Sequence, residues 1–363
     1  MTTTSDRPSR SEGADAASGR AGRSAEPAAR FEFATRDESS RRRPRLRAWA
    51  WSSTGHLEEP RNEHELREAY ARPKTLVWAD IEEADKGILE ALGKCFELHP
   101  LIIEDITERN QRPKIEVTGD VAHLVLFALD YEDRVVEMEI DVVLGERFLL
   151  TAHPAGWDPL EGQHLRDGVE AILREGPDHV LWALADYAVD GYFPVFDQLS
   201  DEIEVLQSDV LERPSQAVVE RLFQIRRDLV AIRHAVTPER EVFNQLTNRE
   251  LPLIQPDHVV YFRDIYDHLI RLTDELDSFR ELVSTTLEAY LSTVNNNLSE
   301  IMKRLTAATV ILAGIGAAAG IFGMSEAGLA LRLAEAPGFW VVTAIVIAIG
   351  AVALVYFRRI GWL

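Results

Sequence analysis

Two long uncharged runs near the carboxyl end constrain what this 363-residue chain can fold into. No charged residue occurs from Leu305 to Phe322, and a second such run extends from Ala336 to Phe357. At about 1.5 Å per residue, a helix over the first run spans about 27 Å, close to the thickness of a bilayer's hydrocarbon core. The sequence therefore predicts two membrane-spanning helices joined by a short loop, rather than a buried helical hairpin in a soluble core.

Basic residues flank the two runs on one side of the predicted membrane. Lys303 and Arg304 precede the first run, and Arg358 and Arg359 follow the second. Because Lys and Arg are enriched in cytoplasmic flanks, we expect both termini in the cytosol and the joining loop outside. This topology is that of a multi-pass protein of a bacterial-type cytoplasmic membrane.

The charge and the cysteine content exclude several classes of function. The formal net charge is −21, which argues against a nucleic-acid partner and against docking of the cytosolic face on anionic lipid. An acidic body does raise the local concentration of cations. Cys95 is the only cysteine, so neither an intrachain disulfide nor a cysteine-based zinc site is expected. No nucleophile–base pair or phosphate-binding loop stands out, and we do not expect an enzyme.

The residues before the spans divide by composition and periodicity. The first residues are rich in Ser, Ala, Gly and Arg with few large apolar side chains, which predicts a disordered, solvated tail that includes the basic run Arg41–Arg47. Alternating patterns predict strands at 76–81, 115–117, 122–129, 135–144 and 148–152, with helices at 85–96 and from 98. The expected organisation is a tail (1–45), an α/β domain (46–165), a helical part (166–256), a stalk helix (257–304), a first span (305–322), an outer loop (323–337), a second span (338–357) and a basic end (358–363).

The helical part has two charge-segregated segments and then one very long helix. Acidic residues before Arg213-Pro214 and basic residues after them predict an antiparallel helix pair with ion pairs between its members. Apolar residues then recur every seven positions from Phe262 to Tyr290, with a second series from Ile265 to Thr286. From Asp257 to Phe322 a continuous helix is about 99 Å long. We expect such a helix to pack on copies of itself across subunits.

A stripe of polar, small or flexible residues follows one side of the first predicted span. Two interpretations remain open: the stripe lines a central channel, or its small residues only let membrane helices approach closely. The periodicity slightly favours a channel. The stripe consists of Glu288, Asn295, Ser299, Met302, Thr306, Thr309, Ala313, Gly316 and Gly320.

Several motifs closely resemble those of the CorA family of divalent metal ion transporters. They cover about residues 70 to 363. The resemblance implies an N-terminal α/β/α cytosolic domain and a stalk helix that continues into the first span, followed by the second span, in a funnel-shaped homopentamer. The motifs are Tyr290-Leu-Ser-Thr-Val-Asn-Asn-Asn-Leu-Ser-Glu-Ile-Met-Lys-Arg-Leu305, Ala319-Gly-Ile-Phe-Gly-Met324, Tyr261-Phe-Arg-Asp-Ile-Tyr-Asp-His268, His99-Pro-Leu-Ile-Ile-Glu-Asp-Ile106, Val210-Leu-Glu-Arg-Pro214, Gln111-Arg-Pro-Lys-Ile-Glu116 and the final Trp362-Leu363.

The resemblance assigns regulatory and pore roles to individual residues. Asp105 and Asp264 match intersubunit carboxylates that sense metal, with Glu104 as a helper, and oxygen ligands suit Mg²⁺. The implied pore positions are Glu288 at the axis, the polar Asn295, the gate residues Met302 and Leu305, and the stripe residues Ser299, Thr309, Ala313 and Gly316.

The outer mouth departs from the family pattern. Gly323, Met324 and Ser325 occupy the place of the usual Gly-Met-Asn, and the serine hydroxyl reaches less far than an asparagine carbonyl. Glu326, the next residue, restores negative charge there. Gly314 replaces a customary proline, and the loop lacks the customary Met-Pro-Glu-Leu.

The resulting hypothesis is a channel for Mg²⁺ influx, gated by intracellular Mg²⁺, with Co²⁺ or Ni²⁺ as minor permeants. Magnesium is then both the regulator and the cargo, with cobalt as a second candidate ion. The expected partners are further copies of the chain and the lipid bilayer, with no nucleic acid and no other protein implied. Two alternatives stay open: a Zn²⁺ transporter of the same superfamily, and a non-conducting metal sensor in the membrane.

Overall fold

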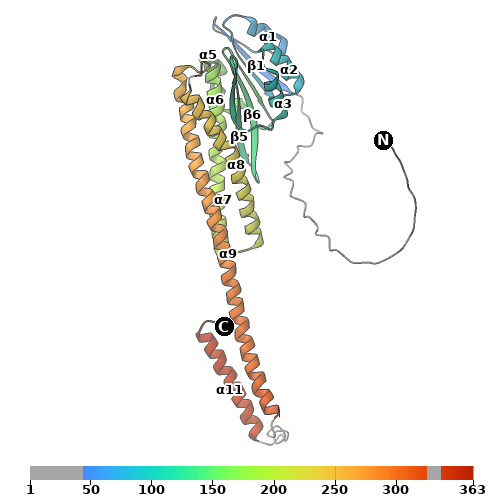
Figure 1. The fold of residues 1–363 in the computed structure, drawn as a ribbon, viewed down its shortest axis with the longest axis vertical. Helices are drawn as coiled ribbons and strands as arrows, with labels where there is room; N and C mark the ends of the chain where they lie inside the picture. The colour runs from blue at the N-terminus through green and yellow to red at the C-terminus, as the bar shows by residue number, and fades with distance from the viewer. Residues whose placement is uncertain (1–43, 250, 325–336, 363) are drawn as a thin grey trace, which may run out of the picture. The chain divides into compact units, whose positions relative to one another are not determined.

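The N-terminal domain of the chain is built on a seven-stranded mixed sheet (Figure 1). A computed structural model describes residues 44–249, 251–324 and 337–362, so the predicted tail and most of the predicted outer loop lie outside it. In spatial order the strands are β2 (His56–Glu58), β1 (Arg45–Ser52), β3 (Leu76–Glu82), β7 (Phe148–His153), β6 (Val135–Gly145), β5 (Val121–Tyr131) and β4 (Lys114–Thr118). The β3–β7 pair is parallel and the other pairs are antiparallel, so the predicted mixed sheet is confirmed.

Each face of the sheet is covered by its own layer of helices. Along β3, Trp78 belongs to one core while Val77 and Ala79 belong to the other, as expected when successive side chains point to opposite faces. One core contains residues of α1 (Glu63–Ala71), α2 (Lys86–Cys95) and α3 (Pro100–Glu108). The other contains residues of α4 (Gln163–Asp167), α5 (Val169–Glu175), α6 (Pro177–Asp190), α7 (Tyr192–Glu212), α8 (Gln216–Asn248) and the start of α9 (Val259–Met324).

The first strand corrects the predicted boundary of the disordered tail. Arg45 and Arg47 lie in β1 rather than in a solvated basic run. Arg47 donates to Asp80 on β3 at 2.6 Å and to Asp158 at 2.8 Å, so its charge anchors β1 within the sheet. The prediction of a solvated charge is therefore wrong for Arg47, while residues 41–43 lie outside the described residues.

The predicted pairing of acidic and basic helices holds for α7 and α8. Arg221 of α8 forms an ion pair with Glu202 of α7, and its guanidinium also reaches the Tyr131 hydroxyl at 2.9 Å. Ser215 caps α8 by accepting from the backbone N–H of Val218.

The heptad series of α9 packs within the chain rather than across subunits. Phe262, Leu269, Leu276 and Val283 are buried and share one core with residues of α7 and α8. Since these neighbours belong to the same chain, this seam is buried within one subunit, and packing of α9 on copies of itself stays a prediction. A hydrophobic period shows that a face is buried but does not identify its partner.

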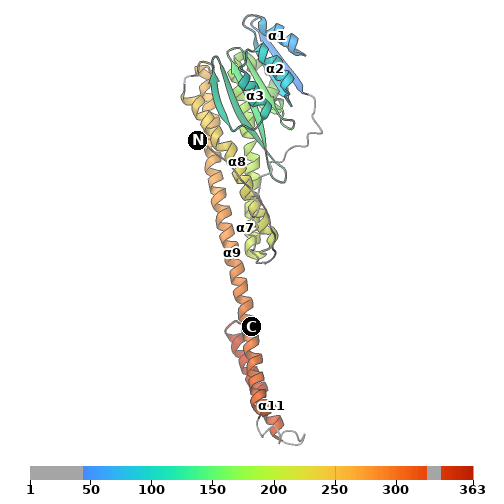
Figure 2. The same ribbon diagram turned by 45° about the vertical axis from the view of Figure 1, so that its right-hand side comes forward.

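Beyond about residue 290, α9 leaves α7 and α8 and its large side chains become exposed (Figure 2). Leu298 is 54% exposed, Leu305 59% and Leu312 69%. An 18-residue stretch of this helix is apolar enough to cross a membrane and is almost entirely exposed. By length and composition, α9 is therefore able to cross a membrane.

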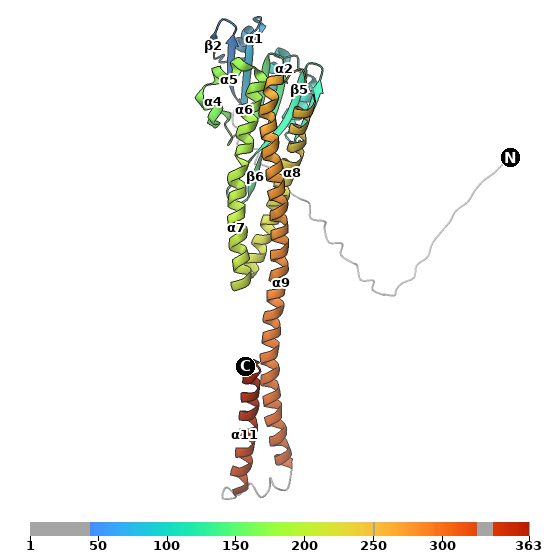
Figure 3. The same cartoon turned by 90° about the vertical axis from the view of Figure 1, so that its left-hand side faces the viewer.

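A last helix, α11 (Pro337–Arg359), lies alongside the end of α9 (Figure 3). Gly350 provides a close approach: a Cβ placed there would lie 3.4 Å from the Ile315 Cδ1 atom. Arg358 and Arg359 end this helix, as the sequence predicts.

A buried carboxyl ties the sheet to α7 and α8. Glu239 of α8 is completely buried; it accepts the Phe127 backbone N–H at 3.3 Å and is hydrogen-bonded to the Tyr192 hydroxyl. That hydroxyl also lies 2.8 Å from the Phe127 carbonyl oxygen. One hydroxyl hydrogen cannot serve two acceptors, so Glu239 must carry the second proton. Burial raises the pKa of Glu239 to about 8, in agreement with a neutral acid.

We predict that Glu239→Gln removes a pH dependence of stability. Because the folded-state pKa lies above the unfolded value, this group's stabilisation is full below about pH 4.5 and falls by up to about 1.4 kcal/mol per pH unit until about pH 8. Glutamine keeps the neutral hydrogen bonds but does not titrate. Thermal unfolding of the purified protein from pH 5 to 8 should therefore show a flatter slope for the variant than for the wild type. The exposed Glu212→Gln is the matched control, and an unchanged slope in Glu239→Gln contradicts the neutral-acid assignment.

Candidate cation pathway and regulatory metal site

Asp105 lies at the edge of α3 and is held by basic and amide groups. Ile102 and Ile106 bury the inner side of the helix, which leaves the Asp105 side chain 27% exposed. The Lys114 Nζ atom is 2.6 Å from one carboxylate oxygen, and the Gln111 Nε2 atom is 3.5 Å from the other. Lys114 is therefore the counter-ion of the Asp105 carboxylate. A divalent cation that binds Asp105 must compete with this lysine.

Glu104, the neighbouring residue, faces a groove between α2 and α3. The groove has a volume of about 640 Å³ and is lined by both apolar and charged residues. Its lining includes Gly93, Ile103, Glu104 and Glu108.

Asp264 lies on the exposed side of α9, two residues after the buried Phe262. Its charge acts on Asp190 at the end of α6: burial first, and Asp264 to a lesser extent, raise the pKa of Asp190. Asp264 therefore belongs to a local group of carboxylates near the start of α9.

A cluster that the sequence reasoning missed lies beside Asp264. One ligand atom from each of Asp186, Asp190 and His268 lies within 4.8 Å of the others, a spacing that could hold a metal ion. Burial and the charge of Asp190 raise the pKa of Asp186, as expected for crowded carboxylates. The available signals were two i,i+4 spacings: Asp186 with Asp190, and Asp264 with His268. These signals did not indicate that α6 and α9 pack together.

One chain does not bring Asp105 and Asp264 together. Asp105 belongs to the α1–α3 layer on one face of the sheet, and Asp264 belongs to α9 on the other face (Figure 1). A site that uses both carboxylates therefore needs two copies of the chain.

The predicted pore stripe lies on the exposed part of α9. Met302 and Leu305 are each 59% exposed. The Ser299 hydroxyl donates to the Asn295 carbonyl at 2.9 Å, and the Thr309 hydroxyl donates to the Leu305 carbonyl at 2.8 Å. The other exposed members are Glu288, Asn295, Thr306, Ala313, Gly316 and Gly320.

The part of this stripe from Asn295 to Thr306 also borders the chain's own carboxyl end. Asn295, Ser299, Met302 and Thr306 share a shallow groove of about 570 Å³ with Trp362. Part of the stripe thus has an aromatic neighbour within one chain.

The outer-mouth residues are only partly described. Gly323 and Met324 are the last two residues of α9, and the surroundings of their side chains are not described. Ser325 and Glu326 lie outside the described residues.

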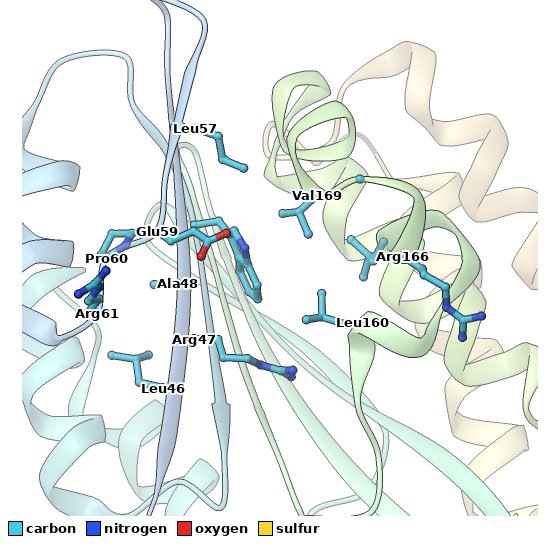
Figure 4. A pocket seen from close by; sticks show the side chains of 13 residues that line it. Leu46, Arg47, Ala48, Leu57, Glu59, Pro60, Arg61, Leu160, Arg166 and Val169 are labelled. Atoms are coloured by element: carbon cyan, nitrogen blue, oxygen red, sulfur yellow. The ribbon is translucent and has the colours of Figure 1, made fainter.

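A pocket beside β1 does not have the features of a ligand site. It has a volume of about 1000 Å³ and lies between β1 and the α4–α5 segment. Arg47 is neutralised there by Asp80 and Asp158, and Arg61 and Arg166 lie on opposite sides of the pocket (Figure 4). Without convergent polar groups, this pocket carries no functional assignment.

The chain is similar to known metal transporters over most of its length. The family model described as CorA-like Mg2+ transporter protein matches residues 73–359. The cobalt/magnesium transport protein CorA of Thermotoga maritima is 35% identical over 80% of this chain and 84% of its own length. The putative metal ion transporter YfjQ of Bacillus subtilis is 27% identical over 78% and 89% of the two chains.

The fold is similar to that of a solved transporter. The complete structure of the CorA magnesium transporter from Methanocaldococcus jannaschii matches with a TM-score of 0.75 and 23% identity, over 88% of this chain and 99% of the other. The shared features are the N-terminal α/β domain and the long helix with its apolar stretch. The chain belongs to the family of CorA-like Mg²⁺ transporters, whose members move divalent cations across membranes and are not enzymes.

Proposed function

We propose that the protein is a Mg²⁺ influx channel of the cytoplasmic membrane, with Co²⁺ and Ni²⁺ as secondary permeants. It crosses the membrane twice, through α9 and α11, with both termini in the cytosol. Intracellular Mg²⁺ closes it by binding between subunits. The observation that carries this proposal is the position of Asp105 and Asp264 on opposite faces of one chain.

Assembly follows from the two surfaces that one chain leaves exposed. Five copies arranged around an axis bring the Asp105 face of each subunit against the Asp264 face of the next. The same arrangement gathers five α9 helices, whose polar stripes then line a common path. A homopentamer in the bilayer is therefore the proposed functional unit, and no other protein is needed.

Metal binding between subunits replaces a local ion pair by an intersubunit contact. In one chain Lys114 neutralises Asp105, whereas Asp264 lies close to Asp186, Asp190 and His268. Uncompensated carboxylates from neighbouring subunits repel each other, and a divalent cation bridges them. Glu104 and the cluster beside Asp264 provide further ligands. Filling the site therefore favours the closed, symmetric ring.

At the outer mouth, Gly323, Met324, Ser325 and Glu326 are proposed to receive the hydrated cation. The serine hydroxyl makes a wider or weaker ring of ligands than an asparagine amide. Backbone carbonyls of Gly323 and the charge of Glu326 compensate for this.

A non-conducting metal sensor is the second candidate function, because Ser325 alters the predicted selectivity ring. A Zn²⁺ transporter is the third, because His268 supplies a nitrogen ligand that suits Zn²⁺, Co²⁺ and Ni²⁺ better than Mg²⁺. Flux of Mg²⁺ separates the first proposal from both.

We predict that the protein in liposomes carries Mg²⁺ flux, measured with an enclosed dye, and that Asp264→Asn weakens inhibition by Mg²⁺ on the cytosolic side. Loss of one ligand charge should raise the half-inhibiting concentration about fivefold or more. The exposed Asp257→Asn is the control and should behave as the wild type. Protection from proteolysis by Mg²⁺ without any flux favours the sensor, and flux of Zn²⁺ alone favours the zinc transporter.

We predict that Lys114→Gln lowers the Mg²⁺ concentration that half-protects the protein from trypsin by about fivefold, because the competing cation beside Asp105 is removed. Lys86→Gln is the matched control, since Lys86 is exposed on α2 and pairs only loosely with Glu90 at 3.8 Å. A higher half-protecting concentration in Lys114→Gln excludes direct competition at Asp105.

We predict that Ser325→Asn keeps or raises Mg²⁺ flux in the liposome assay, because the amide carbonyl extends the ring of oxygen ligands toward the axis. Ser325→Ala should lower the flux, and it serves as the paired comparison. Loss of flux in Ser325→Asn refutes this account of the mouth.

A further inference from the structure

A second group of ionisable side chains lies beneath α3. In the strand register Lys114 lies opposite Val125, which lies opposite Asp141, and His123 lies opposite Val143. Residues directly opposite in antiparallel strands project to the same face. Val143 belongs to the core that α2 and α3 cover, so His123, Lys114 and Asp141 all face the α3 layer.

Two members of this group form a buried pair. The His123 Nε2 atom is 2.9 Å from the Asp141 Oδ1 atom, and both side chains are 1% exposed. The outer atoms of the pair, His123 Nδ1 and Asp141 Oδ2, have no hydrogen-bond partner among the described residues. Asp141 is therefore a buried carboxyl group whose side chain is hydrogen-bonded, among the described residues, to His123 alone.

Glu139 lies two residues before Asp141 on β6, and the charge of Asp141 acts on it. It is 9% exposed, and burial together with the Asp141 charge raises the pKa of Glu139 to about 7. Arg109 and Lys114 act in the opposite direction, but to a smaller extent. Glu139 is thus a carboxyl group that changes charge within the physiological pH range.

The connection between α3 and β4 links Glu139 to Asp105. The Gln111 backbone N–H donates to the two Glu139 oxygens at 3.3 and 3.4 Å, while its side-chain amide nitrogen lies 3.5 Å from Asp105. Lys114, which pairs with Asp105 at 2.6 Å, also attracts the Glu139 charge. Gln111 and Lys114 therefore connect Glu139 with Asp105. Among the described residues, the two carboxyl groups do not contact each other directly.

We propose that Glu139 is a proton-sensitive positioning residue for the Asp105 metal site, so that acidification of the cytosol weakens metal binding there. This inference rests on the proposed regulatory role of Asp105. A charged Glu139 offers Lys114 a further anion besides Asp105 and Glu116 and adds negative potential near Asp105, and both effects favour a divalent cation. When Glu139 is neutral, Lys114 pairs with Asp105 and with Glu116, whose Oε1 atom is 3.3 Å from the Lys114 Nζ atom.

The coupling is reciprocal. If deprotonation of Glu139 raises the metal affinity by a given factor, then metal binding raises the acid dissociation constant of Glu139 by the same factor. Metal binding therefore favours release of the Glu139 proton. A rise in cytosolic acidity therefore relieves inhibition by Mg²⁺ and keeps the channel open at higher internal Mg²⁺.

The test is protection of the full-length protein in lipid nanodiscs from trypsin, titrated with Mg²⁺ at pH 6.5 and pH 8. We expect the half-protecting concentration of the wild type to be about fivefold higher at pH 6.5. Glu139→Gln should remove most of this shift and bind weakly at both pH values. The control Glu146→Gln alters an exposed residue beyond the end of β6 and should keep the shift. Comparing midpoints at each pH cancels the pH dependence of trypsin itself.

A second variant keeps the inference falsifiable if Glu139→Gln folds poorly. Asp141→Asn removes the charge that disfavours ionised Glu139, so the pH response should move to lower pH. Because histidines elsewhere change charge in this range, the decisive quantity is the difference between wild type and variant. A full pH shift in Glu139→Gln, or a wild-type midpoint independent of pH, overturns the inference alone. Absence of protection at every pH and Mg²⁺ concentration overturns the proposed regulatory site instead.

Discussion

The change of environment along α9 is the constraint on which the rest of the structure depends. Up to about residue 286 the helix buries a seam of large side chains against α7 and α8. Each such side chain contributes about 1.5–3 kcal/mol, which fixes the first half of the helix to the sheet domain. The second half exposes residues such as Leu298 and Leu312. One rigid helix thus joins the sheet domain to an exposed apolar surface. The bilayer and neighbouring copies of α9 are the environments that match this apolar surface.

The two-layered sheet gives this helix a means of control. Asp105 and Asp264 lie in different helical layers, so each subunit presents one carboxylate on each side. In the proposed ring, a metal ion between subunits restrains the sheet domains relative to one another. Because α9 is packed on the sheet domain along its first half, that restraint reaches the membrane without a flexible joint. The regulatory chemistry therefore needs no residue near the pore.

Periodicity predicted the strands from β3 to β7 and the length of α9, because both depend on local patterns. It did not predict β1, since Arg47 resembles part of a basic tail until its partner Asp80 is known. The seam of α9 was identified as a packing face, but its partners α7 and α8 in the same chain were not identified. The cluster of Asp186 and His268 was missed because it requires α6 and α9 to be neighbours. In each case the missing information was a contact between segments distant in sequence.

The hydroxyl groups of the stripe bear on the choice between a channel and simple helix packing. Ser299 and Thr309 each donate their single hydrogen to a carbonyl of the preceding turn, so their outward oxygens are left as acceptors. Water bound to a divalent cation points its hydrogens outward, and it needs acceptors. With the Asn295 side-chain amide oxygen and the Glu288 carboxylate on the same side of α9, the stripe offers that surface repeatedly. A face evolved only for close packing gains nothing from such acceptors, and on the proposed pathway they favour a hydrated cation over an anion.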